Sequence, residues 1–290
     1  MKVGVVGVGI MGSAIAGSLL REGAGVAGFD IDARRLNDLA KAGGRPAHSA
    51  GEVSDESEIV LTSLPSAAAL DATVASLLQK PRRALVVAEL STLPIAVKVS
   101  ARDRLAAAGV ELLDCPLSGT GAQAQTGDLA VYASGERAAY DRALPVFEKF
   151  ARVSHYLGDF GNGSKMKFVA NLLVAIHNVA SAEAMVLAKK AGLDPAEVAR
   201  VIASGAGTSK VFELRAPLMV AGNYAPPTMK VDIWQKDMAV IADYAASLGV
   251  ETPLFTSSIP VYNAAQTEGH GGEDTAAVCA VLERMAGLAR

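Results

Sequence analysis

Residues 1–12 read Met1-Lys-Val-Gly-Val-Val-Gly-Val-Gly-Ile-Met-Gly12, an apolar run that passes directly into closely spaced glycines. The run 2–6 is typical of a short buried strand, and an amphipathic helix pattern follows Gly12. The glycines form G-x-G-x-x-G: the first permits a tight turn, the second lets a pyrophosphate approach the backbone, and the third lets helix and strand pack closely. Because a helix N-terminus also attracts anions, we predict a dinucleotide-binding turn made of Gly7, Gly9, Ile10, Met11 and Gly12.

The first half of the chain alternates between short apolar runs and helical patterns. The predicted strands are 2–6, 25–29, 58–63, 84–88, 110–113 and 129–133, and the predicted helices between them are 11–22, 33–42, 67–79 and 94–108. Strands that are apolar on both faces and separated by helices indicate a parallel sheet covered on two sides. We therefore expect an α/β fold in which residues 1–160 form a Rossmann-type, doubly wound parallel sheet that binds a dinucleotide.

The sequence changes character after a glycine-rich loop at 158–163. Residues 164–191 contain neither Pro nor Gly, which predicts one helix on the order of 40 Å long. Further helical patterns follow at 195–204, 208–220, 228–248, 254–267 and 273–288. We expect residues 161–290 to form an all-α domain for substrate binding and dimerisation, entered through the long connecting helix.

The composition limits the classes of protein to which the chain can belong. It has 290 residues, 51% of them hydrophobic, and a formal net charge of −3. It can therefore bury a large core, and it carries no excess of basic groups for nucleic acid or an anionic membrane. No run approaches the ~20 apolar residues of a membrane span. We expect no nucleic-acid partner and no membrane partner.

The cysteines and histidines suggest neither a disulfide framework nor a metal site. Cys115 and Cys279 are the only two cysteines, and each is read as a small buried hydrophobe in a reducing compartment. The four histidines show no ligand spacing with cysteines or acids, so no metal is expected. These features predict a cytoplasmic protein.

The second predicted strand ends at an acid, Asp30. A carboxylate there accepts hydrogen bonds from the adenosine ribose and repels a 2′-phosphate, which favours NAD over NADP. Arg34 and Arg35 stand just beyond and leave NADP open. Ligands of open α/β sheets bind at the carboxyl ends of the strands. The loops after two further strands share this location and are predicted to face the cofactor, whereas each loop taken alone is typical of an ordinary turn. Their residues are Leu64, Pro65 and Thr92.

A loop that follows another predicted strand is a candidate substrate site. Ser118 supplies a hydroxyl, and the neighbouring Gly119 and Thr120 expose backbone N–H groups in a concave turn that can hold a carboxylate. Serine and glycine are also ordinary turn residues, so a purely structural turn is the alternative.

Three further residues carry charged or amide groups that suit catalysis. Lys167 and Asn171 share one face of the long helix. They are either a solvent-facing pair or, if that face is buried, a functional one, because either group is costly to bury without partners. Lys236 stands beside Asp237 and is either an exposed charge or part of the same site.

Four blocks in this order resemble the β-hydroxyacid dehydrogenase family, which includes 3-hydroxyisobutyrate, L-threonate and tartronate semialdehyde enzymes. The blocks are Gly7–Gly12, Asp114–Gly121, Gly161–Asn171 and Lys236-Asp237. The resemblance implies that Lys167 is the catalytic acid–base group and that Asn171 assists it. It also implies that Ser118, Gly119 and Thr120 bind the substrate and that Lys236 reaches both the substrate and the nicotinamide side of the cofactor.

The substrate loop departs from the family pattern at one position. Ser118-Gly119-Thr120 stands where most members have Ser-Gly-Gly. The added hydroxyl and methyl make the pocket smaller or suit a more hydroxylated substrate. Asp232-Ile-Trp-Gln-Lys-Asp237 also looks like the L-threonate type of member. L-threonate or a related sugar acid is therefore favoured over 3-hydroxyisobutyrate, tartronate semialdehyde or succinic semialdehyde.

The resemblance implies hydride transfer between a small β-hydroxy acid and NAD(P), and a C-terminal domain like that of 6-phosphogluconate dehydrogenase. Two other classes remain as alternatives: imine reductases, many of which replace the lysine, and non-catalytic dinucleotide-binding modules, which have lost it. The presence of Lys167 speaks against both. Apolar helix faces and the alanine-rich stretch 180–191 favour a homodimer or a homotetramer.

Overall fold

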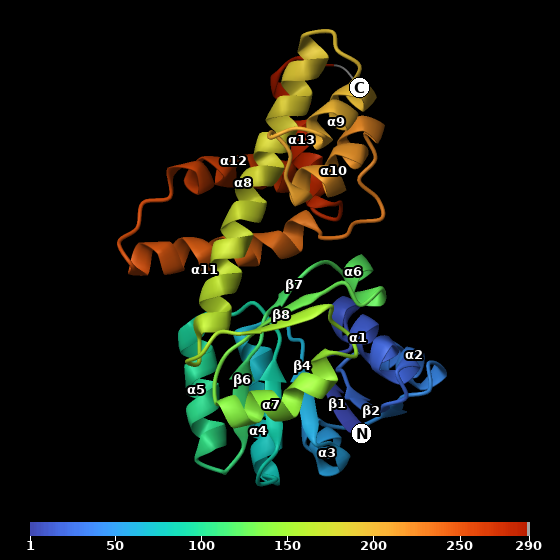
Figure 1. The fold of residues 1–290 in the computed structure, drawn as a ribbon, viewed down its shortest axis with the longest axis vertical. Helices are drawn as coiled ribbons and strands as arrows, with labels where there is room; N and C mark the ends of the chain where they lie inside the picture. The colour runs from blue at the N-terminus through green and yellow to red at the C-terminus, as the bar shows by residue number, and fades with distance from the viewer. Residues whose placement is uncertain (289–290) are drawn as a thin grey trace. The chain divides into compact units, whose positions relative to one another are not determined.

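The computed structural model describes residues 1–288 and divides into two compact units, Met1–Lys167 and Phe168–Arg290. The first unit contains a six-stranded, all-parallel sheet with the strand order β3-β2-β1-β4-β5-β6 (Figure 1). Its strands are β1 (Lys2–Val6), β2 (Gly25–Phe29), β3 (Arg45–Pro46), β4 (Ile59–Thr62), β5 (Val86–Glu89) and β6 (Glu111–Asp114). The helices between them are α1 (Ile10–Arg21), α2 (Ala33–Lys41), α3 (Ala50–Glu56), α4 (Ala67–Gln79) and α5 (Ile95–Ala106).

The strands of the large sheet end together along one edge. Val6 of β1 pairs with Phe29 of β2 and with Thr62 of β4, and the row continues through Glu89 of β5 to Asp114 of β6. The chain builds outward from β1 in one direction and returns to its other side with β4. Such a reversal is the place where open α/β sheets bind ligands. The predicted Rossmann-type sheet is confirmed.

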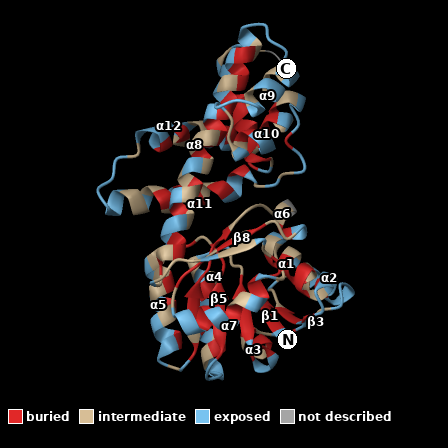
Figure 2. Cartoon of the chain, viewed as in Figure 1, coloured by how far each residue is buried: buried red, intermediate tan, exposed pale blue. Residues whose placement is uncertain are grey.

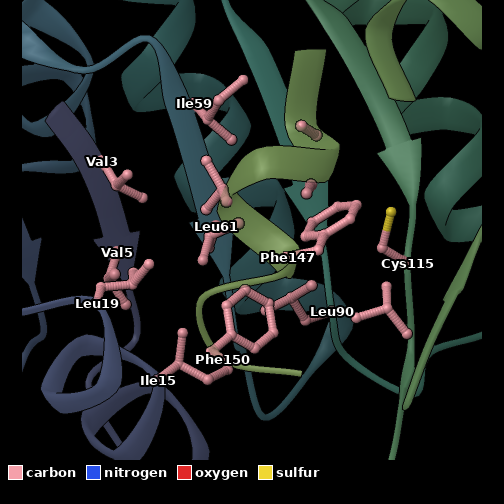
Figure 3. Close-up of a cluster of buried hydrophobic side chains, with 14 of the residues drawn as sticks. Val3, Val5, Ile15, Leu19, Ile59, Leu61, Leu90, Cys115, Phe147 and Phe150 are labelled. Atoms are coloured by element: carbon pink, nitrogen blue, oxygen red, sulfur yellow. The ribbon is translucent and has the colours of Figure 1, made fainter. Parts of the chain in front are cut away.

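Two hydrophobic cores lie on the two faces of this sheet. Ile59 and Leu61 of β4 pack into one core, and Val60 between them packs into the other. Figure 3 shows the first core, in which Phe147 and Phe150 lie with the strand residues. Burying each such side chain contributes roughly 1.5–3 kcal/mol. Burial on both faces explains why these strands are continuously apolar and do not alternate.

A second sheet of three strands follows in the same unit. It has the order β7-β8-β9 and consists of β7 (Leu117–Ser118), β8 (Ala130–Ala133) and β9 (Val153–Tyr156), with α6 (Gly121–Gln125) and α7 (Arg137–Phe147). The strand predicted at 129–133 exists as β8, but it belongs to this second sheet. Its predicted place in the large parallel sheet was wrong. A further parallel strand needs a crossover of a dozen or more residues, usually a helix, whereas β8 turns back antiparallel on β7.

The second unit is helical. It contains most of α8 (Asn162–Lys190), then α9 (Pro195–Ala203), α10 (Lys210–Ala221), α11 (Val231–Ser247), α12 (Pro253–Ala265) and α13 (Val278–Met285). The long helix and the helical character of this half are confirmed. The single helix predicted at 273–288 was wrong, because the Asp274 carboxylate accepts the Ala276 N–H and starts a separate 3₁₀ turn, Thr275–Ala277, before α13.

The prediction that no apolar run approaches the length of a membrane span was wrong for helix α8. Within the described residues it is the one helix that is long and apolar enough, by length and composition alone. However, 44% of its apolar stretch is buried inside the protein, and buried and exposed positions alternate along it (Figure 2). Its Asn178 amide is buried and donates to Tyr262 and to the Thr275 carbonyl. Such pairing is typical of the core helix of a globular unit.

Candidate active site

The turn after β1 requires glycine at two positions because backbone atoms lie too close for a side chain. Gly7 adopts φ +85°, and a Cβ there would lie 2.2 Å from the Ser63 carbonyl oxygen. A Cβ on Gly12 would lie 1.9 Å from the Gly7 carbonyl oxygen. A side chain at Gly7 would clash with the loop after β4, and one at Gly12 would push α1 away from the end of β1, so both glycines are needed for the turn itself.

Gly9 differs, because the nearest atom to a Cβ there is the tip of the Arg35 guanidinium at 3.2 Å. The protein's own packing therefore leaves the face of Gly9 open. No side chain caps α1 after Gly9, whereas Asp32 caps α2 and Ser66 caps α4. An open glycine face beside an uncapped helix N-terminus fits a pyrophosphate. Ile10 and Met11 lie in the first turn of this helix.

Asp30 lies directly after β2, and its carboxylate accepts the Asp32 N–H at 2.9 Å. The two nearby arginines have different positions. Arg34 is exposed and holds both oxygens of the Asp32 carboxylate, at 3.1 and 2.9 Å, and this pairing lowers the pKa of Asp32. Arg35 reaches back to the glycine turn, where its guanidinium donates to the Val8 carbonyl at 3.4 Å.

The two loops after β4 and β5 are joined at the same sheet edge. The Leu64 N–H donates to the Ser91 hydroxyl at 2.8 Å. Pro65 is exposed next to Leu64, and Thr92 is half-buried next to Ser91. Because Thr62 and Glu89 are register partners, both loops begin at the carboxyl edge that also carries the glycine turn.

The loop after β6 and β7 packs beside the glycine turn within the first unit. Ser118 ends β7 and is half-buried, and Gly119 follows with φ +134°. A Cβ on Gly121 would lie 2.7 Å from the Ile10 side chain. The Ser18 hydroxyl of α1 donates to the Ala124 carbonyl of α6. The candidate substrate loop and the candidate cofactor turn are therefore neighbours.

Thr120 is the N-cap residue of α6, which gives a structural reason for a threonine where most family members have glycine. Its hydroxyl accepts the Gln123 N–H, and its own N–H donates to the Gln123 side-chain oxygen at 3.0 Å. This reciprocal pair is a capping box, which stabilises the start of a short helix. The hydroxyl thus holds α6 in place, and the loop offers the Ser118 hydroxyl and backbone groups to a ligand.

Lys167 lies one turn inside α8 and is half-buried. The first turn of α8 is attached to the end of β6: the Asp114 carboxylate accepts the Ser164 N–H and the Ser164 hydroxyl, each at 2.7 Å. Lys165 is exposed and donates to the Asn162 side chain. The two lysines therefore have different surroundings, and Lys165 is the solvent-facing one.

Asn171, one turn after Lys167, is buried in the second unit together with part of α11. Its amide donates to the Asp237 carboxylate at 3.0 Å, and the two residues are only 4% and 7% exposed. The Lys236 ammonium lies 3.4 Å from the other oxygen of the same carboxylate and is half-buried. The structure therefore brings Asn171, Lys236 and Asp237 together, and the burial of Asn171 and Asp237 argues against a solvent-facing Lys167–Asn171 pair and an exposed Lys236–Asp237 pair.

Several contributors were missed from the sequence. Asp237 and Asp114 stood in the quoted blocks without a predicted role, and Ser164 and the buried Lys98 of α5 were not singled out. One signal for Lys98 was available, because it shares a helix face with Ala101 and Leu105, both of which are buried. A lysine in an apolar row indicates a buried partner of opposite charge.

Each half of the chain matches the model of a known protein family. Residues 2–158 match the family described as the NAD binding domain of 6-phosphogluconate dehydrogenase. Residues 161–282 match the one described as NAD-binding of NADP-dependent 3-hydroxyisobutyrate dehydrogenase. The chain is 36% identical to the L-threonate dehydrogenase of Cupriavidus necator, over 97% of this chain and 96% of that protein.

Two solved structures are similar over almost their full length. A 3-hydroxyisobutyrate dehydrogenase from Salmonella typhimurium is 32% identical with a TM-score of 0.86, covering 97% of this chain and 99% of that one. A 3-hydroxyisobutyrate dehydrogenase from Mycobacterium tuberculosis, solved with L-serine, is 26% identical with a TM-score of 0.88, covering 97% and 98%.

Proposed function

This chain is an NAD(P)-dependent dehydrogenase of the β-hydroxyacid dehydrogenase family, and we propose that it interconverts a small β-hydroxy acid with its oxo acid or semialdehyde. L-threonate or a related sugar acid is the favoured substrate. The full-length similarity to an L-threonate dehydrogenase supports this choice. Branched acids such as 3-hydroxyisobutyrate, and tartronate or succinic semialdehyde, are the competing substrates.

The observation that carries the proposed chemistry is the fixed orientation of Asn171 one turn from Lys167. A carboxylate can only accept hydrogen bonds, so the nitrogen of the Asn171 amide must face Asp237. The amide oxygen and the second N–H are then left for a ligand. This arrangement offers a hydroxyl or carbonyl group of a substrate a defined partner beside a lysine.

The residues that would hold NAD(P) are those along the carboxyl edge of the large sheet. They are the glycine turn with Gly7, Gly9, Ile10, Met11 and Gly12, then Asp30, Leu64, Pro65 and Thr92. Lys236, which lies on α11 of the second unit, is assigned to the nicotinamide side by the family resemblance alone. Bound NAD(P) would supply the hydride acceptor for oxidation of the carbon that bears the substrate hydroxyl. NAD is favoured over NADP, because Asp30 is anionic and Arg34 is occupied by Asp32.

The chain itself supplies positioning and a proton acceptor. Lys167, in its neutral form, takes the hydroxyl proton as the acid is oxidised and returns it in the reverse direction. Asn171 holds the reacting oxygen. The Ser118 hydroxyl and the backbone N–H of Gly119 bind the substrate carboxylate, and Thr120, whose N–H is bonded to Gln123, lines the same loop.

Replacing Lys167 tests this assignment. Lys167→Ala is expected to lower kcat by about 10²- to 10⁴-fold, the usual contribution of general acid–base catalysis, with the Kd for NADH unchanged by titration. Lys165→Ala is the matched control, since Lys165 is exposed two residues earlier on the same helix. Wild-type turnover in Lys167→Ala would exclude the proposed mechanism.

A substrate panel separates the competing readings. L-threonate, D-glycerate, 3-hydroxyisobutyrate and 3-hydroxypropionate are each assayed with NAD and with NADP by the absorbance of the reduced cofactor. Fastest oxidation of L-threonate supports the proposed substrate class. Reduction of a cyclic imine in place of any hydroxy acid would identify an imine reductase, and NADH binding with no turnover would identify a non-catalytic module.

We also propose a role for each half of the chain and an oligomeric state for the protein. Residues 1–160 are the cofactor-binding domain and residues 161–290 the substrate and dimerisation domain of a cytoplasmic homodimer or homotetramer. Exposed Leu187, Leu193 and Val201 lie around an apolar groove between the end of α8 and α9, and such a surface is typical of an interface. Light scattering of the wild type and of Leu187→Glu tests this: a monomeric wild type would exclude it.

A further inference from the structure

The first unit holds a buried cluster of charges that the proposed reaction does not use. Lys98 of α5, Glu89 at the end of β5 and Asp114 at the end of β6 all have side chains with no exposed surface. The Lys98 ammonium lies 2.6 Å from Glu89, 2.8 Å from Asp114 and 2.7 Å from the Ser91 carbonyl oxygen. The Lys98 ammonium therefore donates hydrogen bonds to Asp114 and to the Ser91 carbonyl and forms an ion pair with Glu89.

Lys98 is a permanent cation in this cluster. Burial alone lowers the pKa of Lys98, but the carboxylates of Asp114 and Glu89 outweigh burial and raise that pKa above the ordinary lysine value. A lysine that keeps its proton throughout the working pH range cannot exchange protons with a substrate. Its effect on a reaction must come through the groups that it holds.

One set of groups held by Lys98 forms the candidate cofactor loops. The second oxygen of the Glu89 carboxylate accepts the Ser91 N–H at 2.9 Å, while Lys98 donates to the Ser91 carbonyl. The Ser91 hydroxyl in turn accepts the Leu64 N–H at 2.8 Å. Thr92 follows Ser91 directly. The loops after β4 and β5 therefore take their positions from the same ammonium.

The other set is the start of α8. Asp114, paired with Lys98, accepts both the N–H and the hydroxyl of Ser164 at 2.7 Å. A Cβ on Gly163 would lie 2.2 Å from the Tyr132 carbonyl oxygen and 2.7 Å from the Asp114 carbonyl oxygen, so the helix start is pressed against this strand end. An acid bonded to the first N–H groups stabilises a helix N-terminus. Lys167 lies three residues further on.

We propose that Lys98 is a positioning residue that fixes Lys167, through Asp114 and Ser164, and the Leu64 and Thr92 loops, through Glu89 and Ser91. This inference rests on the proposed role of Lys167. It predicts that one buried cation couples the placement of the proton acceptor to the placement of the cofactor loops. Misplacing a catalytic group by about 1 Å costs on the order of 10²-fold in rate.

The sharpest test is at Ser164, because the hydroxyl can be removed without removing a charge. Ser164→Ala is expected to lower kcat with L-threonate about 10- to 100-fold, with the KM for NAD unchanged. Ser164→Thr, which restores a hydroxyl, is expected to recover most of that loss. Ser181→Ala is the matched control: it is a buried serine of the same helix whose hydroxyl donates to the His177 carbonyl, outside the cluster.

Lys98→Met tests whether Lys98 positions both the cofactor loops and the start of α8. It is expected to weaken NADH binding by titration as well as to lower kcat, whereas Ser164→Ala changes kcat alone. Hydrogen–deuterium exchange supplies a readout apart from turnover: amides at 89–93 and 161–168 are expected to exchange faster in Lys98→Met, and only 161–168 in Ser164→Ala. If Lys98→Met does not fold, the Ser164 series and its exchange data decide the matter.

The outcomes separate this inference from the proposed function. Equal kcat values for Ser164→Ala and Ser181→Ala, with wild-type exchange at 161–168, would overturn the positioning role even if Lys167→Ala is inactive. Unchanged turnover in Lys167→Ala would instead remove the proposed function on which the inference rests. A loss of kcat in Ser164→Ala that Ser164→Thr recovers supports it.

Discussion

The Asn171 amide and the Asp237 carboxylate, 66 residues apart in the sequence, are joined by a buried hydrogen bond of 3.0 Å. The bond connects α8, which carries Lys167, to α11, which carries Lys236. Because the carboxylate admits only donors, it determines which end of the amide is free. One acid therefore sets the orientation of Asn171 and also pairs with Lys236.

Asp237→Asn is expected to leave the orientation of the Asn171 amide undetermined, since an amide can present either its oxygen or its nitrogen to Asn171. We expect kcat/KM to fall about 10- to 100-fold, the effect of losing a hydrogen bond to a charged group, while cofactor binding is retained. Asp232→Asn, an exposed acid at the start of the same helix, is the control. Steady-state kinetics of both variants check the prediction, and equal values for the two would contradict it.

Gly9 and Gly12 are expected to respond differently to the same substitution. Gly9→Ala meets only the flexible tip of Arg35, so it should fold normally and raise the KM for NAD about 5- to 150-fold, corresponding to about 1–3 kcal/mol of steric cost. Gly12→Ala meets the Gly7 carbonyl and should lower the free energy of unfolding by about 3 kcal/mol. Thermal unfolding and cofactor titration distinguish the two, and a stable Gly12→Ala variant with intact binding would be inconsistent with this geometry.

Asp30→Asn tests the cofactor preference without disturbing the turn. The amide oxygen can still accept the Asp32 N–H that the carboxylate accepts now, but the charge that repels a 2′-phosphate is gone. We expect the ratio of kcat/KM for NADP over NAD to rise about 10-fold or more, from about 1–4 kcal/mol of relieved repulsion, at unchanged Tm. Asp38→Asn, exposed on α2, serves as the control, and a wild type that already prefers NADP would refute the assignment.

Tyr262 is expected to make stability fall at alkaline pH. Burial raises its pKa to about 12 from an ordinary value of 10.0. Between about pH 10 and 12 the unfolded chain therefore releases this proton while the folded chain keeps it, so the free energy of unfolding decreases as pH rises. The contribution is complete below about pH 10.

Tyr262→Phe should remove that alkaline decrease. It should also cost about 1–3 kcal/mol near neutral pH, because the hydroxyl bonds both Asn178 and the Ala175 carbonyl. Urea unfolding at several pH values measures both effects. Tyr244→Phe, at a half-buried position of the same unit, is the control. An alkaline slope in Tyr262→Phe equal to that of the wild type would show that other groups cause the decrease.

Local patterns in the sequence were sufficient for most of the fold. The glycine spacing at 7–12, the both-face apolar strands and the uninterrupted run at 164–191 each depend on near neighbours, and all three correspond to elements of the structure. The partner of a strand is less local. The run at 129–133 was recognisable as a strand, but its pairing with β7 depends on how the intervening loop turns back.

For the candidate site, too, some features follow from local sequence and others from non-local contacts. The sequence by itself determined which blocks carry Ser118, Lys167, Asn171 and Lys236, because their spacing and order are visible in one dimension. Only the tertiary structure decided what holds them: Asp237 against Asn171, and Lys98 against Glu89 and Asp114. The physical reason is that a buried charge must find its partner wherever the fold brings one within hydrogen-bond distance, and no local pattern records that distance.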